Sequence, residues 1–368
     1  MEKKSFHLQN SEQCIKMCLK SYVSALALLF GMFFSGCKSS AESLFPYTVS
    51  LEGRMLSVGD NLGNAHSLEA VDDYLILADN HGSTLYTILK TDGSYCFHFG
   101  RVGQGPNEMK QLSGAMMIRD GYLTLSDSYK LFQHNLDSLY LSVDHPISTP
   151  NFEKSDRMIW VSNLTDSLFI ATGVFPSGKR FKVLNWTGDI HSYVGEYPLE
   201  ENTDSPFYVI GASFMSIMTG HPESNRFAVG TQYGGVLDVL EWKTSDFSLD
   251  RVGGISQFVP KVTSKNIQGT PNFRPNEKTR WGYVRMDSDA HYIYGLYSGR
   301  LQRDEIPFYK GNIVHVVDWD GVPVCQIKLD KDVLDIAVAG NKLYALYEDA
   351  DIGYEVIEYV LPDNWQKK

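Results

Sequence analysis

The sequence predicts an all-β protein, a six-bladed β-propeller of four-stranded antiparallel blades. Three observations indicate this fold: one type of apolar strand recurs six times, turn signals recur in the same phase, and the last repeat lacks one strand. The composition agrees, because 43% hydrophobic and 12% aromatic residues can fill a large core. The 31 Gly and 21 Tyr residues favour strands and turns over helices.

The recurring strand is an almost continuous apolar run that ends in polar residues or glycine. Its six copies begin at residues 74, 122, 168, 226, 292 and 342 and read YLILADN, YLTLSDS, LFIATGV, RFAVGTQ, YIYGLYS and KLYALYE. Successive copies are 46 to 66 residues apart, at or somewhat above the length of a propeller blade. Such runs suit strands that are buried on both faces, as they are when blades pack against one another.

Two kinds of turn signal keep the phase of this repeat. Gly, Asn and Asp permit the positive φ of a tight turn, and they form hairpin signals at Lys90–Gly93, Asn185–Asp189 and Asp318–Gly321. Glycine also marks the passage between blades, at Arg101–Gly103, Val194–Glu196 and Arg251–Gly253. The agreement of three signals in one phase favours a repeat architecture over two ordinary domains.

The last repeat indicates how the ring closes. Val333–Ala339, Lys342–Tyr347 and Tyr354–Leu361 form three strands, and no fourth strand follows them. We expect Thr48–Met55 to provide that strand and so to close a propeller domain that spans residues 45–364, because closure protects edges that an open sheet exposes. Two stacked β-sandwiches, the alternative, explain neither the six similar strands nor this deficit.

The amino-terminal region has the features of a signal peptide. Lys16 and Lys20 precede the apolar run Tyr22–Phe34, whose 13 residues are too few for a typical membrane span. A start of translation at Met17 gives a leader of ordinary length, and we expect translation to begin there. A buried helix that ends at a cysteine by chance is the alternative reading of this region.

The apolar run ends in Phe34-Ser35-Gly36-Cys37, which resembles the lipobox of bacterial lipoproteins. The resemblance implies that residues 1–36 are removed and that Cys37 carries lipid as the new amino terminus. Residues 37–44 then read as a short tether. We expect a lipid-anchored protein of the cell envelope, so the membrane is one of its partners.

Charge and cysteine content exclude several classes of function. The formal charge is -11, and because residues 1–36 hold four Lys and two Glu, the rest of the chain carries 29 basic and 42 acidic residues. Such an acidic balance argues against nucleic-acid binding. Cys96 and Cys325 are the only cysteines after Cys37, and both lie in strand patterns, where we expect small packed residues rather than a disulfide or a zinc site.

One motif connects the chain to a known family. Gly100-Arg101-Val102-Gly103-Gln104-Gly105-Pro106-Asn107-Glu108 resembles the G-x-x-G-x-G-P-x-E signature of six-bladed TolB-like and NHL-like propeller lipoproteins of the Bacteroidetes type. Its clear occurrence in one place only favours the TolB-like group over NHL proteins, which repeat it. The resemblance implies a fold and a location, the outer membrane, much more than a mechanism.

Sequence motifs for catalysis are absent. The chain contains no G-x-S-x-G elbow, no H-E-x-x-H sequence and no EF-hand loop, and no Lys-Ser or Lys-Thr follows the glycine motif as in a phosphate-binding loop. We therefore expect no cofactor and no metal at a local motif. Because calcium-dependent lactonase propellers assemble their metal ligands from several blades, a metal-dependent hydrolase or lactonase remains the alternative function.

Candidate ligand-binding residues lie where the repeat places connections between the second and third strands and between blades. In a propeller these connections gather on one face around the central channel, which we call the loop face. The candidates are Asn80, His81, Arg101, Gln104, Asn107, Glu108, Tyr129, Tyr233 and Arg300. A stiffened turn is the favoured reading of the glycine motif. The long insertion Gly254–Arg280 either caps this face or is a surface excursion.

The sequence thus predicts a binding or scaffold module, with a glycan, a peptide or an envelope protein as its partner. Charged, amide and aromatic side chains on one face suit polar ligands of these kinds.

Overall fold

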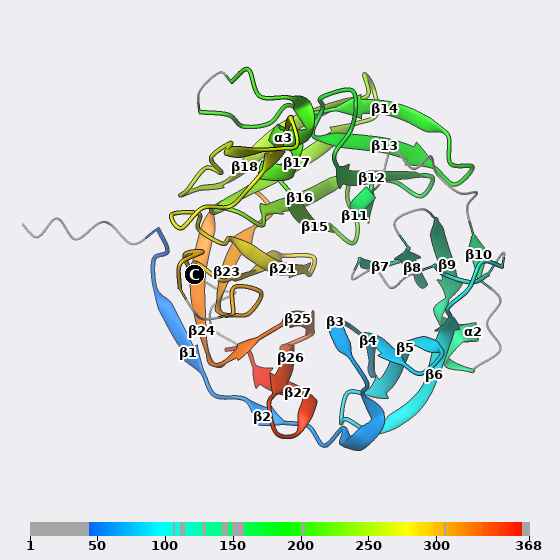
Figure 1. The fold of residues 1–368 in the computed structure, drawn as a ribbon. Helices are drawn as coiled ribbons and strands as arrows, with labels where there is room; N and C mark the ends of the chain where they lie inside the picture. The colour runs from blue at the N-terminus through cyan, green and yellow to red at the C-terminus, as the bar shows by residue number, and fades with distance from the viewer. Residues whose placement is uncertain are drawn as a thin grey trace, which may run out of the picture. The chain divides into compact units, whose positions relative to one another are not determined.

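We describe the fold from a computed structural model of the chain. The structure describes residues 44–105, 107–110, 115–127, 130–141, 146–148, 158–200, 203–304 and 307–362. The described residues from Phe45 onward belong to one compact unit. In this unit, six blades surround a central axis, which confirms the predicted β-propeller (Figure 1).

The first three blades each use four consecutive strands, the lowest-numbered of which is closest to the axis. Blade 1 contains β3 (Ala65–Val71), β4 (Tyr74–His81), β5 (Thr84–Lys90) and β6 (Tyr95–Arg101). Blade 2 contains β7 (Met116–Arg119), β8 (Tyr122–Ser126), β9 (Leu131–Asn135) and β10 (Ile147–Ser148). Blade 3 contains β11 (Met158–Asn163), β12 (Leu168–Gly173), β13 (Phe181–Asn185) and β14 (Ile190–Val194).

The remaining blades follow the same plan with additions. Blade 4 contains β15 (Ser216–Gly220), β16 (Arg226–Thr231), β17 (Val236–Lys243) and β18 (Ser248–Ser256). Blade 5 contains β21 (Tyr283–Ser288), β22 (Tyr292–Tyr297), β23 (Gly311–Asp318) and β24 (Pro323–Val333). Blade 6 contains β25 (Asp335–Ala339), β26 (Lys342–Asp349) and β27 (Gly353–Val360). The described helices are η1 (Gly59–Asn61), α2 (Leu136–Tyr140) and α3 (Phe207–Ser213).

The six predicted apolar runs are the second strands of the six blades: β4, β8, β12, β16, β22 and β26. In β4, Ile76 packs with residues of blade 2, whereas Leu75 and Leu77 pack with residues of blade 6. All three side chains are fully buried, and each burial contributes about 1.5–3 kcal/mol. The sequence is apolar without alternation because each of these strands has a neighbouring blade on both faces.

The amino-terminal segment closes the ring, as predicted, but it divides between two blades. β2 (Arg54–Met55) is the fourth strand of blade 6 and pairs antiparallel with β27. β1 (Thr48–Leu51) instead joins blade 5 as a fifth strand, parallel to β24. The segment crosses between blades at Gly53, where a Cβ atom would lie 2.2 Å from Cγ2 of Ile357. Glycine is therefore required for this close approach.

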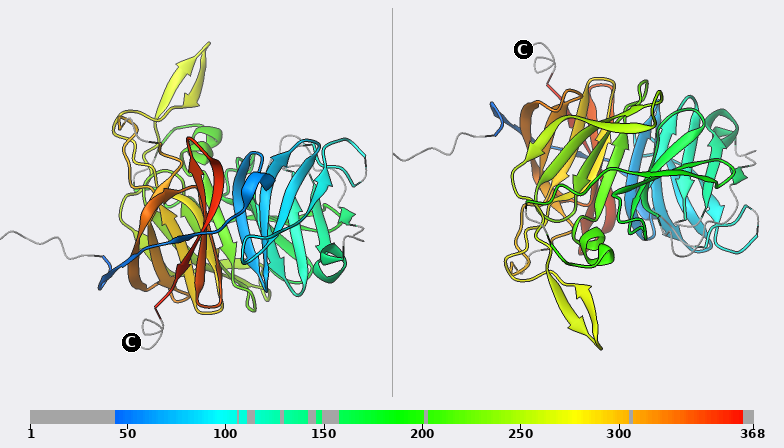
Figure 2. Two further views of the ribbon diagram at one scale, coloured as in Figure 1. Left: turned by 90° about the horizontal axis from the view of Figure 1, so that it is seen from below. Right: turned by 90° about the horizontal axis from the view of Figure 1, so that it is seen from above.

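The two faces of the propeller carry different helices and insertions. The β19–β20 hairpin (Ser264–Ile267 and Thr270–Phe273) and α3 lie on the loop face, whereas α2 lies on the opposite face (Figure 2). The hairpin belongs to the insertion Gly254–Arg280 and projects away from the propeller instead of crossing the channel. Its base remains connected to the body, because β20 packs against α3.

Both cysteines of the described chain are free and lie in strands, as expected. Cys325 of β24 is fully buried, and burial raises the pKa of its thiol to about 12. Cys96 of β6 is partly buried, and burial raises the pKa of its thiol too. Neither thiol has the lowered pKa of a reactive cysteine.

Candidate functional site

The glycine motif forms the connection from blade 1 to blade 2. Glu108 folds back over this connection, and its Oε2 accepts a hydrogen bond of 2.9 Å from the backbone N–H of Gly105. A Cβ atom on Gly103 would lie 1.9 Å from the same oxygen. The Glu and Gly residues of the signature are thus required together, because the carboxylate occupies the space that a side chain on Gly103 would need.

The same loop presents Arg101, Gln104 and Asn107 as exposed side chains. His81 pairs with Thr84 at the end of the β4–β5 hairpin, and Thr84 pairs in turn with Arg101 of β6. The structure therefore brings two of the predicted groups, Asn80–His81 and Arg101–Glu108, to the same edge of blade 1.

A row of polar side chains supports His81 from within blade 1. The ring of His81 stacks on that of His98 at 4.4 Å between centroids. Nδ1 of His98 and the hydroxyl of Thr87 share a hydrogen bond of 2.9 Å, and that hydroxyl donates to Oδ2 of the buried Asp79 at 2.7 Å. Burial, and then the charge of His81, lower the pKa of His98. These hydrogen bonds orient the stacked rings of His81 and His98 at the edge of the loop face.

Tyr233 and Arg300, the predicted residues of blades 4 and 5, lie on either side of Trp281. Tyr233 forms a β-bridge with Trp281, and the backbone N–H of Trp281 donates to the carbonyl oxygen of Arg300 at 2.8 Å. The ring of Tyr233 is 4.8 Å from that of Trp281 and 4.9 Å from that of Phe273. Trp281 in turn stacks on Phe308 at 3.8 Å with an interplanar angle of 12°.

We call this group of rings the aromatic shelf. It consists of Tyr233, Phe258, Phe273, Trp281, Phe308 and Tyr309. Three of them have exposed rings, with 40% exposure for Phe258, 37% for Phe308 and 48% for Tyr309. Exposed aromatic rings gathered on one face indicate a binding surface.

Backbone pairing holds the shelf in place. The N–H of Gly234 donates to the carbonyl of Arg280 at 2.7 Å, and the N–H of Gly282 donates to that of Gln232 at 2.8 Å. A Cβ atom on Gly282 would lie 2.3 Å from the carbonyl oxygen of Thr231. Because the strand segments approach so closely, the rings are fixed before any ligand arrives, and preorganisation of this kind favours binding.

A hollow of about 400 Å³ lies beside the shelf. Tyr233, Phe258 and Phe273 are its aromatic lining residues, and the charged side chains of Lys261, Lys278 and Glu200 line it as well. The guanidinium of Arg280 lies over the ring of Phe258, 4.4 Å from its centroid. A smaller hollow of about 180 Å³ adjoins Trp281, Phe308 and Tyr309. The site thus combines ring faces with cations.

Arg300 has a structural task in this region. Its guanidinium donates to the carbonyl oxygens of Pro307 and Lys310 and, at 2.7 Å, to Oδ1 of Asp332. These contacts fasten the loop between β22 and β23 onto the end of β24. Arg300 therefore holds the loop that carries Phe308 and Tyr309 of the shelf.

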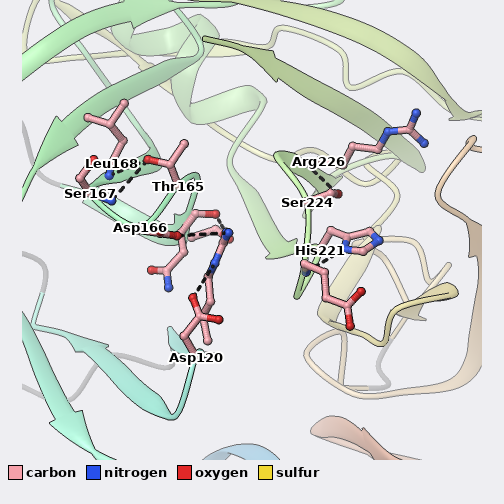
Figure 3. A network of polar contacts seen from close by, with 12 residues as sticks. Asp120, Thr165, Asp166, Ser167, Leu168, His221, Ser224 and Arg226 are labelled. Atoms are coloured by element: carbon pink, nitrogen blue, oxygen red, sulfur yellow. Dashed lines mark hydrogen bonds and ion pairs between the residues drawn. The ribbon is translucent and has the colours of Figure 1, made fainter.

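A further hollow of about 320 Å³ lies in the central channel, at the mouth opposite the loop face. The inner strands of all six blades contribute to its lining. Asp120 and Asp166 lie on one side of this mouth and His221 on the other (Figure 3). In the described part of the chain, no three carboxylate, imidazole or thiol groups converge as a metal site.

Some residues that the sequence analysis singled out cannot be placed. Cys37, Tyr129 and Pro106 lie outside the described residues. Trp281 and Phe308 of the shelf, and the channel hollow, were not among the sequence candidates. The aromatic and proline content of the insertion could have pointed to the shelf, but no local signal marks the channel residues, which come from separate strands.

The comparisons with known proteins agree with the architecture. A profile of the family described as TolB-like 6-blade propeller-like matches residues 65–341, most of the chain. The chain belongs to this TolB-like propeller family. This membership confirms the resemblance that the glycine motif and the repeat indicated. No curated protein matches the sequence significantly.

Solved structures with similar folds have low sequence identity to this TolB-like chain. A protein of Bacteroides fragilis named as a candidate exported protein is 10% identical, with a TM-score of 0.48, and 86% of this chain and 99% of that chain are covered. A protein of unknown function from Bacteroides thetaiotaomicron is 11% identical, with a TM-score of 0.47. The match covers 85% of this chain and 74% of that chain. The WD40 domain of Neurospora crassa Pan2 is 11% identical, with a TM-score of 0.43. The match covers 85% of this chain and 95% of that chain.

Proposed function

We propose that this protein is a lipid-anchored protein of the cell envelope whose aromatic shelf binds a glycan with acidic groups. The stack of Trp281 on Phe308, beside a hollow edged by lysines, is the observation that carries the proposal. Sugar rings present flat faces of C–H groups that pack on aromatic rings, and their hydroxyls bind polar groups at the edge of such a site.

The charge of the insertion favours acidic sugars over neutral ones. Residues 257–280 contain five basic residues and one acidic residue, a net charge of +4. The rest of the chain has 28 basic and 43 acidic residues, a net charge of -15. A basic segment on an acidic protein attracts anionic ligands to one place and repels them elsewhere. Lys261, Lys278 and Arg280 bring this charge to the hollow.

The anchoring part of the proposal rests on the leader. The basic flank, the apolar run Tyr22–Phe34 and the small residues before Cys37 favour export and attachment of lipid to Cys37, with the outer membrane as the location. None of the helices in the described ranges has the length and apolar composition of a membrane span. A lipid anchor holds the propeller at the membrane while the shelf binds its ligand.

A peptide or an envelope protein is the competing ligand. An acidic peptide matches the charge but has no rigid flat face for the ring stack. The metal-dependent hydrolase has no supporting observation in the described residues, where no metal-ligating cluster occurs.

Calorimetric titration tests the proposal. The full-length protein in detergent is titrated with oligogalacturonate, a neutral oligosaccharide of the same length and an oligoglutamate peptide. We expect oligogalacturonate to bind most tightly, and Trp281→Ala to weaken it by about tenfold or more, a loss of about 1.4 kcal/mol. Tyr122→Ala, which removes an exposed ring from β8, should leave the affinity unchanged.

The three ligands separate the parts of the proposal. Equal affinity for the acidic and the neutral sugar would contradict the role of the lysines but retain a glycan site. Binding of the peptide alone would overturn the glycan assignment. Unchanged affinity in Trp281→Ala would place the binding site elsewhere.

A further inference from the structure

The hollow in the central channel is separate from the aromatic shelf and opens at the opposite mouth. Met116, Met117, Met218 and Met286 line it together with Trp160. Its polar lining includes Arg119, His221 and three carboxyl groups, those of Glu69 on β3, Asp287 and Asp289. A carboxyl group in such surroundings is costly unless a cation compensates it.

Glu69 differs in its contacts from the other carboxyls of the channel. Asp289 accepts hydrogen bonds from the N–H of Tyr292 and from the hydroxyl of Tyr294. Asp287 of β21 accepts a hydrogen bond of 2.6 Å from the N–H of Val338 in the next blade. Asp335 of β25 accepts from the Ser67 hydroxyl at 2.7 Å and from a neighbouring backbone N–H of blade 1. These two aspartates join adjacent blades. For Glu69 no hydrogen bond occurs in the described part of the chain, so it has no comparable structural task.

The charges that act on Glu69 within the described residues are both negative. Burial, and then the charges of Asp287 and Asp335, raise the pKa of Glu69 well above its ordinary value. Burial likewise raises the pKa of Asp287 to about 7. These surroundings favour the protonated form of Glu69, whereas a cation beside it would favour the ionised form.

The basic group nearest to these carboxyls is already engaged. Nε of Arg285 lies 3.4 Å from Oδ2 of Asp335, and its other nitrogens donate to the carbonyl oxygens of Val284 and His66. Its guanidinium also lies over the ring of Trp160, at 5.5 Å. Arg285 thus pairs with Asp335, and among the described residues neither Glu69 nor Asp287 forms an ion pair.

The basic groups at the mouth of the channel hollow do not compensate the charge of Glu69. Arg119 of β7 is paired with two exposed carboxylates, Asp120 at 3.4 Å and Asp166 at 3.6 Å. His221 accepts a hydrogen bond at Nδ1 from the N–H of Glu223, and burial lowers its pKa, so it is neutral near pH 7. Figure 3 shows His221 across the view from Asp166.

We propose that the channel hollow binds an organic cation, an ammonium group with small apolar substituents, and that Glu69 is its counter-ion. Methionine sulfur and the Trp160 ring suit a polarisable, weakly hydrated cation. A metal ion needs several converging ligands, which the described residues do not provide here. Because the cation favours the ionised form of Glu69, its binding releases a proton to the solution.

Titration with tetramethylammonium chloride tests this site in the full-length protein. Potassium chloride at the same ionic strength is the reference. We expect saturable binding of tetramethylammonium with an enthalpy that depends on the ionisation enthalpy of the buffer, which reports proton release. The affinity should rise with pH, because the carboxyl of Glu69 must lose its proton to act as the counter-ion. This pH series needs no variant.

Variants then assign the site. Glu69→Gln keeps the shape of the protonated carboxyl, so we expect it to fold, and it should weaken binding by at least about tenfold and abolish the proton release. Glu69→Asp, which keeps the charge, should retain the release if Glu69→Gln does not fold. Glu241→Gln, on the outer part of blade 4, is the matched control.

Each contrary result overturns the inference. Absence of saturable binding by the wild type excludes an organic-cation site. Equal binding of potassium excludes the preference for an ammonium group. Unchanged affinity in Glu69→Gln excludes Glu69 as the counter-ion. None of these results bears on the glycan proposal, because the shelf shares no lining residue with the channel hollow.

Discussion

At the scale of single residues, His315 on β23 shows how burial couples protonation to stability. The hydroxyl of Tyr283 and Nδ1 of His315 share a hydrogen bond of 3.1 Å, and the rings of Phe45 and Tyr297 lie 4.5 and 4.6 Å from the imidazole. Burial lowers the pKa of His315 to about 3. In the unfolded chain the imidazole has a pKa of about 6.5, so it takes up a proton at pH values at which it stays neutral in the folded chain.

This difference gives a pH-dependent stability. Above pH 6.5 His315 is neutral in both states and its contribution is complete. As the pH falls from 6.5 toward 3, the unfolded state gains the proton and stability falls by about 1.4 kcal/mol per pH unit. We expect the free energy of unfolding of His315→Gln to depend less steeply on pH between pH 6.5 and pH 4.5 than that of the wild type. Urea titration at a series of pH values measures this dependence. Parallel profiles for variant and wild type would contradict the assignment.

The glycine motif has a residue-scale explanation of another kind. The sequence alone suggested a stiffened turn, and the contacts of Glu108 with Gly105 support that reading for its carboxylate. The exposed Arg101, Gln104 and Asn107 remain candidate ligand residues of the loop face.

At the scale of elements, blades 3 and 4 are joined by a buried ion pair. Nη1 of Arg180, next to β13, donates to Oδ2 of Asp238 on β17 at 2.7 Å, and both side chains are about 95% buried. Arg251 of β18 donates to the other oxygen of Asp238 at 2.8 Å. One carboxylate thus compensates two guanidinium groups at the seam between the blades.

Removal of this carboxylate charge should be costly. Asp238→Asn leaves the buried Arg180 without a counter-charge, and we expect the free energy of unfolding to fall by about 3–5 kcal/mol. Denaturant titration measures this loss. Glu241→Gln removes a carboxylate from the more exposed pair with Lys243 on the same strand, and it should change stability little. Similar losses in both variants would show that burial of the pair does not matter.

At the scale of the whole molecule, ring closure depends on the crossing at Gly53. The N–H of Gly53 donates to Oδ1 of Asp330 at 3.3 Å, and Nη2 of Arg54 pairs with Oε1 of Glu358 at 3.0 Å. The short strand β2 adds little area itself, but its pairing protects the edge of blade 6.

Substitution at the crossing should therefore destabilise the whole propeller. The side chain of Gly53→Val would collide with Ile357 and with the ring of Tyr359, and we expect a loss of about 1–3 kcal/mol and a lower Tm. Ser50→Ala, an exposed position on β1, should leave Tm within experimental error. Scanning calorimetry checks both. A normal Tm in Gly53→Val would show that β2 is dispensable for closure.

The sequence by itself determined the blade number, the position of each second strand, the closure by the amino-terminal segment and the family. These follow from local physics, because a strand buried on both faces must be apolar throughout and a tight turn requires Gly, Asn or Asp. Asn80, Arg101 and Tyr233 could be assigned to the loop face for the same reason, since the repeat phase fixes where each strand ends.

Only the tertiary structure decided which of these residues meet. Trp281 lies next to Tyr233 through backbone pairing across nearly fifty positions of sequence, and Glu69 meets Asp287 because β3 and β21 both face the axis. No local pattern encodes such encounters, because they depend on how blades distant in sequence pack around one channel. The sequence therefore determined the propeller ring, and the packing of the blades determined which side chains meet on its two faces.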